Sequence, residues 1–232
     1  MTAPSDVVIL KESRMSFMVK AAAVALAGDE TGPVLRTRTD DLLPLVKAVV
    51  AGDKDAAGTL VGHLGRSMLS VVRRVLGRQC AEVDDVTQDA VIALLDSLAS
   101  FRGECTVFHF AQRIAMLTAL TAQRRIRLRE RWTADADAPA DAVACPHRES
   151  PMESAAARLR RALVRDLLGE LPDVIAESLG MHYVLGYTVD EIAAAAGISP
   201  NTVWSRLRLG KQALRRKLAG DARLAERLEV RP

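Results

Sequence analysis

The sequence predicts an all-α protein made of two small helical domains joined by a flexible acidic linker. Three observations lead to this fold class. Hydrophobic residues make up 49% of the 232 positions while aromatic residues make up only 3%, and β-branched runs that could build a sheet are few. Apolar residues recur at helical spacing in two stretches of the chain. The segment between those stretches is rich in Ala, Asp and Pro and lacks that spacing, as a tether does.

The expected boundaries follow these changes in apolar periodicity. Residues 1–38 are expected to be a variable N-terminal extension, in which Met15 and Met18 are alternative start sites. The apolar run after Met18 is too short and too internal for a signal peptide, and no run reaches membrane-spanning length, so membrane insertion is not expected. A first helical domain is expected at residues 39–131 and the linker at 132–153. A helix-turn-helix domain is expected at 154–220, followed by a tail at 221–232.

The first domain is expected to be a bundle of four or so helices. Apolar residues recur at helical spacing from Leu42 to Leu98, and Gly52-Asp53 and Phe101-Arg102-Gly103 break the pattern as turns. Within this stretch, polar residues occupy one helical face opposite apolar ones. The polar members are Asp85, Gln88 and Asp89, and the apolar members are Val86, Ala90 and Val91. This face could serve a partner, although a solvated acidic face explains it equally well by itself.

The last helix of the first domain combines aromatic and basic residues. Phe108 and Phe110 stand at its start, and arginines follow at helical spacing along one side and its flank. These arginines are Arg113, Arg124, Arg125, Arg127, Arg129 and Arg131. A basic block of this kind suits a polyanion, although a solvated helix face would explain it too. Either phenylalanine taken alone fits a role in the hydrophobic core better.

The strongest local signal is a helix-turn-helix near the C-terminus. Thr188 and Glu191, three residues apart, are expected to form a capping box at the start of its first helix. Gly197 supplies the left-handed residue that ends this helix. Ser199 followed by Pro200 is an N-cap followed by a favoured first helical residue.

The second helix of this motif divides its side chains between the core and a partner. Val203 and Leu207, at i and i+4, are expected to face the core. The side chains left toward solvent or DNA are Asn201, Thr202, Trp204, Ser205, Arg206 and Arg208. An ordinary αα-hairpin explains the caps but not this cluster of DNA-competent side chains.

Together these motifs resemble the sigma-70 superfamily of RNA polymerase sigma factors, in its extracytoplasmic-function type. The segments of the C-terminal domain that carry the resemblance are Leu171-Pro172 and residues 186–193, 197–207 and 210–218. Those of the N-terminal domain are Gly52-Asp53, residues 84–89, Phe101-Arg102-Gly103-Glu104, residues 113–115 and Arg124-Arg125. The resemblance covers roughly residues 40–220, with the linker similar in position only.

The resemblance implies a sigma factor that binds core RNA polymerase, recognises the minus-10 and minus-35 promoter elements and promotes DNA opening. It implies polymerase binding, on a coiled coil of the largest subunit, by Asp84, Asp85, Gln88 and Asp89. The implied minus-10 residues are Phe101, Phe108, Phe110, Arg113, Arg124, Arg125 and Arg127. For the minus-35 element, Trp204, Ser205 and Arg208 match base-reading positions, and Asn201, Thr202, Arg206 and Lys211 are placed for phosphates. An anti-sigma protein is left open as a further partner.

The chain departs from the family pattern in the helix that handles the minus-10 element. Phe110 stands where family members commonly have Trp, and Leu117 and Thr121 stand where they commonly have Asn and Asp. These differences leave open an unusual promoter sequence. The acidic linker, in the fashion of the family, would thread through the polymerase toward the RNA exit path, and an inert tether is the alternative.

Other function classes fit the sequence less well. A stand-alone helix-turn-helix regulator would not need the aromatic and basic segment of the first domain. The acidic pairs Asp40-Asp41 and Asp84-Asp85 diverge by about 100 degrees on a helix, so they make a poor metal clamp for an enzyme. Cys80, Cys105 and Cys145 form no CxxC pair, so neither a disulfide framework nor a metal site is expected. No cofactor is expected, and the expected compartment is the cytoplasm.

Overall fold

The computed structural model describes residues 41–135, here called the first block, and residues 164–220, the second block. The helices of the first block are α2 (Leu43–Val50), α3 (Lys54–Leu76), α4 (Val83–Ser97), the 3-10 helix η1 (Leu98–Ser100) and α5 (Val107–Asp135). The second block has a helical segment at residues 164–169, then α7 (Asp173–Leu179), the π-helix η2 (Gly180–Val184), α8 (Val189–Ala196) and α9 (Pro200–Gly220). These two ranges contain no strand, and the predicted all-α fold class is confirmed.

Helix α3 forms the centre of the first block. Asp53 begins it as an N-cap, since its carboxylate accepts hydrogen bonds from the backbone N–H groups of Asp55 at 2.9 Å and Ala56 at 3.1 Å. Apolar residues at every fourth position, among them Leu60, Leu64 and Met68, are fully buried against α4 and α5. This buried stripe holds α4 and α5 in position, and the outer faces of these two helices carry candidate sites.

Helix α5 continues beyond the end predicted for the first domain. The linker was expected to begin at residue 132, but the helix runs through Asp135. Residues 127–134 are rich in Arg, Glu, Leu and Ala, which favour helix even where apolar periodicity fades. Residues 136–153 of the predicted linker lie outside the described residues, as do the predicted N-terminal extension at 1–38 and the tail at 221–232.

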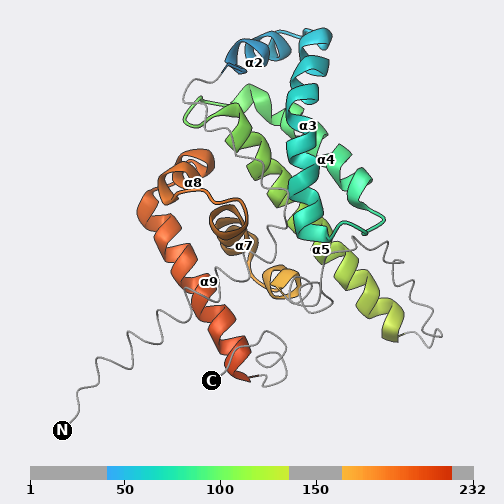
Figure 1. Ribbon diagram of the computed structural model, residues 1–232, viewed down its shortest axis with the longest axis vertical. Helices are drawn as coiled ribbons and strands as arrows, with labels where there is room; N and C mark the ends of the chain where they lie inside the picture. Colours follow the sequence, from blue (N-terminus) through green and yellow to red (C-terminus); the bar gives the residue numbers. More distant parts are fainter. Residues whose placement is uncertain (1–40, 136–163, 221–232) are drawn as a thin grey trace, which may run out of the picture.

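The second block packs directly against α5. Figure 1 shows α7 between α5 in green and α9 in orange-red, and both α7 and α8 contact α5. A single cluster of buried apolar side chains includes Ala115 and Leu120 of α5 together with Leu171, Leu179 and Leu207 of the second block. The helical parts on either side of the predicted linker are therefore joined through a common core. No described helix is both long enough and apolar enough to cross a membrane.

Candidate polymerase and nucleic-acid interfaces

The helix-turn-helix of α8 and α9 has the local geometry that its sequence predicts. The Thr188 hydroxyl accepts from the Glu191 N–H at 3.3 Å, and the Glu191 carboxylate accepts from the Thr188 N–H at 2.8 Å, which completes the capping box. Gly197 ends α8 at a positive φ of 64°, in the left-handed region. The Ser199 hydroxyl accepts from the Thr202 N–H at 3.2 Å at the start of α9. These caps fix the angle at which α9 leaves the turn.

Replacing Thr188 with Ala should lower the free energy of unfolding by about 1 kcal/mol, within a range of about 0.5–2 kcal/mol. The substitution removes the acceptor for one backbone N–H at the start of α8 and leaves Glu191 with half of the capping box. Urea denaturation measures the loss. Thr59→Ala is the matched control, because Thr59 is an exposed threonine inside α3 with no capping role. Equal unfolding free energies for the two variants would contradict the role of the cap.

Helix α9 presents a mixed polar and aromatic face to solvent. Val203 and Leu207 are buried at 0% and 1% exposure, as predicted, and they anchor the helix on α7 and α8. Gly210 allows a close approach, since a Cβ there would lie 2.6 Å from Leu179 Cδ1 of α7. Trp204 is 57% exposed. An open hollow of about 450 Å³ on this face is lined by Asn201, Trp204, Ser205, Arg208 and Lys211.

Arg206 differs from its neighbours on α9. It is only half-buried in a helix whose Ser205 and Arg208 are exposed. Burial raises the pKa of the Glu177 carboxyl of α7, and the charge of Arg206 opposes part of that rise. Arg206 was expected among the outward residues, and the structure leaves it only partly exposed.

Helix α4 presents the predicted acidic face. Its exposed residues include Asp84, Asp85, Gln88 and Asp89, while Val86 and Ala90 lie in the core of the first block. Ile92 also belongs to this face and is 50% exposed, which the sequence interpretation missed. Its spacing could have identified it, because residues three or four positions after Gln88 and Asp89 share their helical face. Ile92 thus places one large apolar side chain at the edge of the acidic stripe.

The phenylalanines at the start of α5 are partly buried. Phe101 and Phe110 stack at a ring-centroid distance of 5.0 Å with a tilt of 47°, and both pack against the core of the first block, as does Phe108. A core role is the one that fits Phe108 or Phe110 best when either is taken alone, and this packing agrees with it. Farther along α5, Leu117 and Thr121 line an open hollow with Asp89 and Arg125, of about 310 Å³. Two of the departures from the family pattern therefore lie on one surface beside the acidic face of α4.

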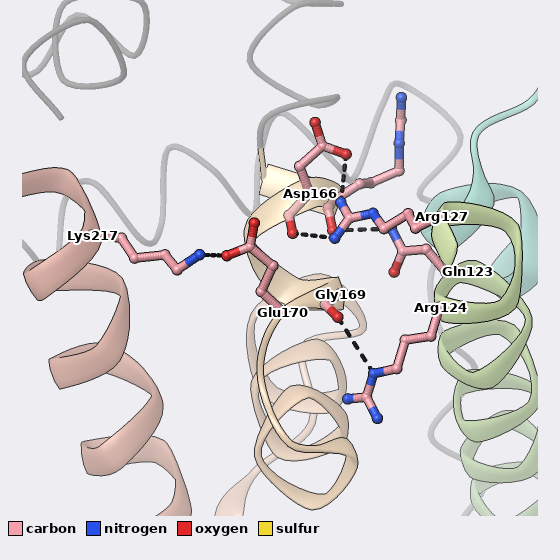
Figure 2. Close-up of polar contacts among 8 residues, drawn as sticks. Gln123, Arg124, Arg127, Asp166, Gly169, Glu170 and Lys217 are labelled. Atoms are coloured by element: carbon pink, nitrogen blue, oxygen red, sulfur yellow. Dashed lines mark hydrogen bonds and ion pairs between the residues drawn. The ribbon is translucent and has the colours of Figure 1, made fainter. Parts of the chain in front are cut away.

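Three predicted DNA-contacting arginines of α5 contact the second block instead of open solvent. Arg113 Nε donates to Glu177 Oε1 at 2.6 Å, and Arg124 pairs with Asp173 at 2.6 Å. Arg127 donates to the carboxylate of Asp166 at 2.5 Å and to the Asp166 carbonyl oxygen at 2.6 Å. Figure 2 shows the last of these contacts, with Arg127 and Gln123 of α5 turned toward the second block.

The other two arginines with described contacts pair within the first block. Arg125 and Arg129 both reach the carboxylate of Glu82, which precedes α4, and the Arg125 distance is 3.2 Å. Arg125 remains 62% exposed, so this contact leaves much of its guanidinium in water. The side chain of Arg131 lies outside the described ones. The predicted basic face of α5 is thus divided between two sets of acidic partners.

Glu177 is the most deeply buried charged residue among those described, at 2% exposure. Burial raises the pKa of its carboxyl above the usual value, and the guanidinium of Arg113 opposes that rise. A buried carboxylate requires such a partner, because an unpaired charge in the protein interior is very costly. No local sequence signal points to Glu177, since nothing in its neighbourhood distinguishes it from an exposed acidic residue on α7.

The described residues contain no group of three or more His, Cys, Asp or Glu side chains that could hold a metal ion. The side chains at the surfaces described above are capable of charge pairing, hydrogen bonding and aromatic stacking. Such groups suit the recognition of another macromolecule.

Comparisons with known proteins match both blocks. Residues 60–129 match the family model for Sigma-70 region 2, and residues 157–214 match that for Sigma-70, region 4. The ECF RNA polymerase sigma-E factor of Haemophilus influenzae is 28% identical over 75% of this chain and 93% of its own length. The RNA polymerase sigma-H factor of Pseudomonas aeruginosa is 27% identical over 75% of this chain and 92% of its own. The solved structure of CnrH in complex with the cytosolic domain of CnrY is 24% identical, with a TM-score of 0.47, and covers 79% of this chain and 99% of that one.

Proposed function

This chain belongs to the sigma-70 family, in its extracytoplasmic-function type, and we propose how its surfaces divide the work of a sigma factor. It binds core RNA polymerase, recognises the minus-10 and minus-35 promoter elements and promotes DNA opening for transcription initiation. Sigma factors are transcription initiation factors and not enzymes. Family matches in both blocks disfavour the alternative of a stand-alone helix-turn-helix regulator. We place its action in the cytoplasm, with its polymerase and promoter.

The minus-35 element is assigned to the outward face of α9, which is the observation that carries the proposal. The exposed residues lie along α9. The preceding helix is capped, and α9 is anchored by its buried residues Val203 and Leu207, as in a recognition helix. Arg208 can donate two parallel hydrogen bonds to a guanine edge, and Trp204 can contact thymine methyl groups. Ser205 lies between them and suits either base type. Base discrimination is therefore assigned to these three residues.

The phosphate contacts of the second block are assigned to residues near the three that are assigned to base discrimination. Asn201 and Thr202 lie at the start of α9, where backbone N–H groups point outward and favour an anion. Lys211 lies one turn beyond Arg208 and carries a point charge suited to a phosphate. Arg206 is given a smaller share, because it is half-buried while Ser205 and Arg208 are exposed.

Polymerase binding is assigned to the acidic face of α4. Asp84, Asp85, Gln88 and Asp89 offer carboxylate and amide groups in a continuous stripe, and Ile92 adds an apolar contact at its edge. Complementary charge on the partner would steer association and fix orientation, while a desolvated apolar residue would supply affinity. The partner surface should accordingly be basic with an apolar pocket.

The minus-10 element is assigned to α5 and the turn before it. Phe101, Phe108 and Phe110 are half-buried, so each keeps part of its ring accessible to an unstacked base. Arg113, Arg124, Arg125 and Arg127 supply cations for the backbone of the opened strand. We propose that residues 39–131, most of which lie in the first block, form the polymerase and minus-10 domain, and that residues 154–220 form the minus-35 domain.

The test of this division is in vitro transcription with core polymerase and a library of promoter fragments. The chain should direct initiation at a defined set of promoters, with sequence preference at both elements. Duplex DNA alone should be bound only weakly. Tight, sequence-specific binding of duplex DNA without polymerase, together with no polymerase-dependent start sites, would overturn the proposal and favour a stand-alone regulator.

A further inference from the structure

We propose that the C-terminal end of α5 is a further DNA-binding surface, in which Leu128 and Trp132 pack against the promoter duplex that borders the minus-10 element. The proposal rests on the minus-10 role proposed above for α5, and it adds two residues that have no role so far. Trp132 also lies beyond the residues that match Sigma-70 region 2, which end at 129. Exposure, surrounding charge and position along the helix support the proposal.

Leu128 and Trp132 form an exposed apolar pair near the end of α5. At 58% and 73% exposure they are the two most exposed large apolar side chains among the described residues. They are four positions apart, so they lie on the same face of the helix. Figure 1 shows the last turns of α5 extending past the ends of α3 and α4. Exposure alone does not define a site, and the groups around the pair decide what can cover it.

Two cations stand beside this apolar pair. Arg125 lies three residues before Leu128, and Arg129 lies three residues before Trp132, so the four side chains share one side of α5. The side chains of Arg125 and Arg129 are 62% and 58% exposed, and both pair with the Glu82 carboxylate. Exposed pairs of this kind contribute little and leave much of each guanidinium in water. The apolar pair therefore has a basic border.

This side of α5 differs from the side that packs on the second block. Arg124 and Arg127 bind second-block acceptors. Arg125 follows Arg124 and Leu128 follows Arg127 by one residue, which is a rotation of about 100 degrees around a helix. The side that carries Arg125, Leu128 and Trp132 is accordingly open to solvent.

The same side continues into the open hollow beside α4. Thr121 and Arg125 line that hollow and are four positions apart. Leu128 and Trp132 follow at steps of three and four residues, which keeps all four side chains on one stripe. We call these four residues the outer stripe of α5. A ligand that enters the hollow can thus follow the helix to Trp132.

A nucleic acid is the occupant that the outer stripe fits. Guanidinium groups suit phosphates, while an aromatic ring and a leucine suit the sugars and the thymine methyl groups between them. A second copy of this chain would bring Arg125 and Arg129 against the same residues of its partner, and like charges across an interface are costly. The basic polymerase surface expected opposite α4 would be repelled in the same way.

Distances along α5 indicate which part of the promoter reaches the stripe. Phe110 and Arg125 are separated by about 22 Å, at about 1.5 Å per residue, which corresponds to about six nucleotides at about 3.4 Å each. That is about the length of a minus-10 element. Trp132 lies about 10 Å farther, or about three base pairs. The unstacked bases at the phenylalanines lead toward the transcription start, so the far end of α5 meets duplex on the upstream side.

Leu128 and Trp132 therefore contact the duplex about three base pairs upstream of the minus-10 element. Arg125 and Arg129 hold its phosphates, and the apolar pair excludes water beside them. Contacts to the backbone position a protein on DNA and carry no sequence information by themselves. The outer stripe thus anchors the segment between the two recognised elements and tolerates changes in its sequence.

The test combines a protein variant with a shortened DNA. The test variant is Leu128→Ala with Trp132→Ala. The control is Leu43→Ala with Val50→Ala, which removes two exposed apolar side chains from α2. Circular dichroism verifies the fold of each full-length protein before assembly with core polymerase. Fluorescence anisotropy then measures binding to two fork DNAs without a minus-35 element, one with about ten base pairs of upstream duplex and one that ends at the minus-10 element.

The wild type and the control should prefer the longer DNA by the same factor. The test variant should bind the longer DNA about tenfold more weakly than the wild type, because it loses the burial of about one large apolar side chain. It should bind the shorter DNA as the wild type does. Trp132→Phe alone should stay close to the wild type, since phenylalanine keeps an aromatic ring at this position.

A photocrosslinker locates the contact directly. With p-benzoylphenylalanine in place of Trp132, the holoenzyme on a full promoter should crosslink to duplex within about five base pairs upstream of the minus-10 element. Crosslinks to a polymerase subunit would overturn the proposal and make the outer stripe a protein-docking surface.

The two DNAs separate a failure of this inference from a failure of the proposed function. Equal affinity of the test variant and the wild type for the longer DNA, or an equal loss on both DNAs, would overturn the inference alone. Failure of the wild-type holoenzyme to bind either DNA would overturn the proposed minus-10 role of α5 and the inference with it.

Discussion

Replacing both Asp85 and Gln88 with lysine should reduce the affinity for core RNA polymerase by about 100-fold or more, since like charges placed across a protein interface cost several kcal/mol. Both side chains are exposed on α4, and neither contributes to the core of the first block. The fold should therefore survive, with an unchanged circular dichroism spectrum. Fluorescence anisotropy with labelled protein and increasing core polymerase measures the change.

A matched control is the double variant Asp55→Lys with Thr59→Lys. It changes the net charge by the same amount, and its residues are also exposed and lie in the first turns of a helix, α3. This control should bind polymerase like the wild type at equal ionic strength. If both variants lose affinity equally, net charge and not the acidic face of α4 determines binding, and the docking assignment is wrong.

The features that the sequence predicted well are those set by neighbours along the chain. The capping box depends on two residues three positions apart, and the orientation of α9 depends on Val203 and Leu207 one turn apart. Gly197 was identifiable because a left-handed residue at a helix end favours glycine. In each case the physical cause lies within about one helical turn.

The features that the sequence did not predict depend on contacts between distant segments. Arg113 and Glu177 are 64 residues apart, and only the packing of α7 on α5 makes the carboxylate buried and paired. The π-helix η2 is a second case, in which the Leu185 N–H donates to the Gly180 carbonyl oxygen five residues earlier. Local propensity does not specify that widened turn, which sits where Gly180 meets Met116 of α5. The same packing turned arginines that look like a DNA-binding face into an interface within the chain.

The recognition helix should lose base-specific affinity when Arg208 is changed to Ala, by about 1–3 kcal/mol at particular base pairs of the minus-35 element. Arg208 is exposed on α9 beside Trp204, and both line the outward hollow. Trp204→Ala should relax preference at other positions, where thymine methyl groups are read. Polymerase holoenzyme binding to a library of minus-35 variants measures these preferences position by position.

Lys211→Ala provides the matched comparison, because it removes the same single charge from the same face of α9. Its loss should weaken binding to all sequences alike and reduce the slope of log affinity against log salt by about one unit. Arg66→Ala, which removes an exposed charge from α3, should change neither preference nor slope. We expect this difference because the guanidinium of arginine can donate two parallel hydrogen bonds to a base edge, whereas the ammonium of lysine is a point charge that suits a phosphate. A uniform loss across the library for Arg208→Ala, equal to that for Lys211→Ala, would show that α9 contacts only the DNA backbone.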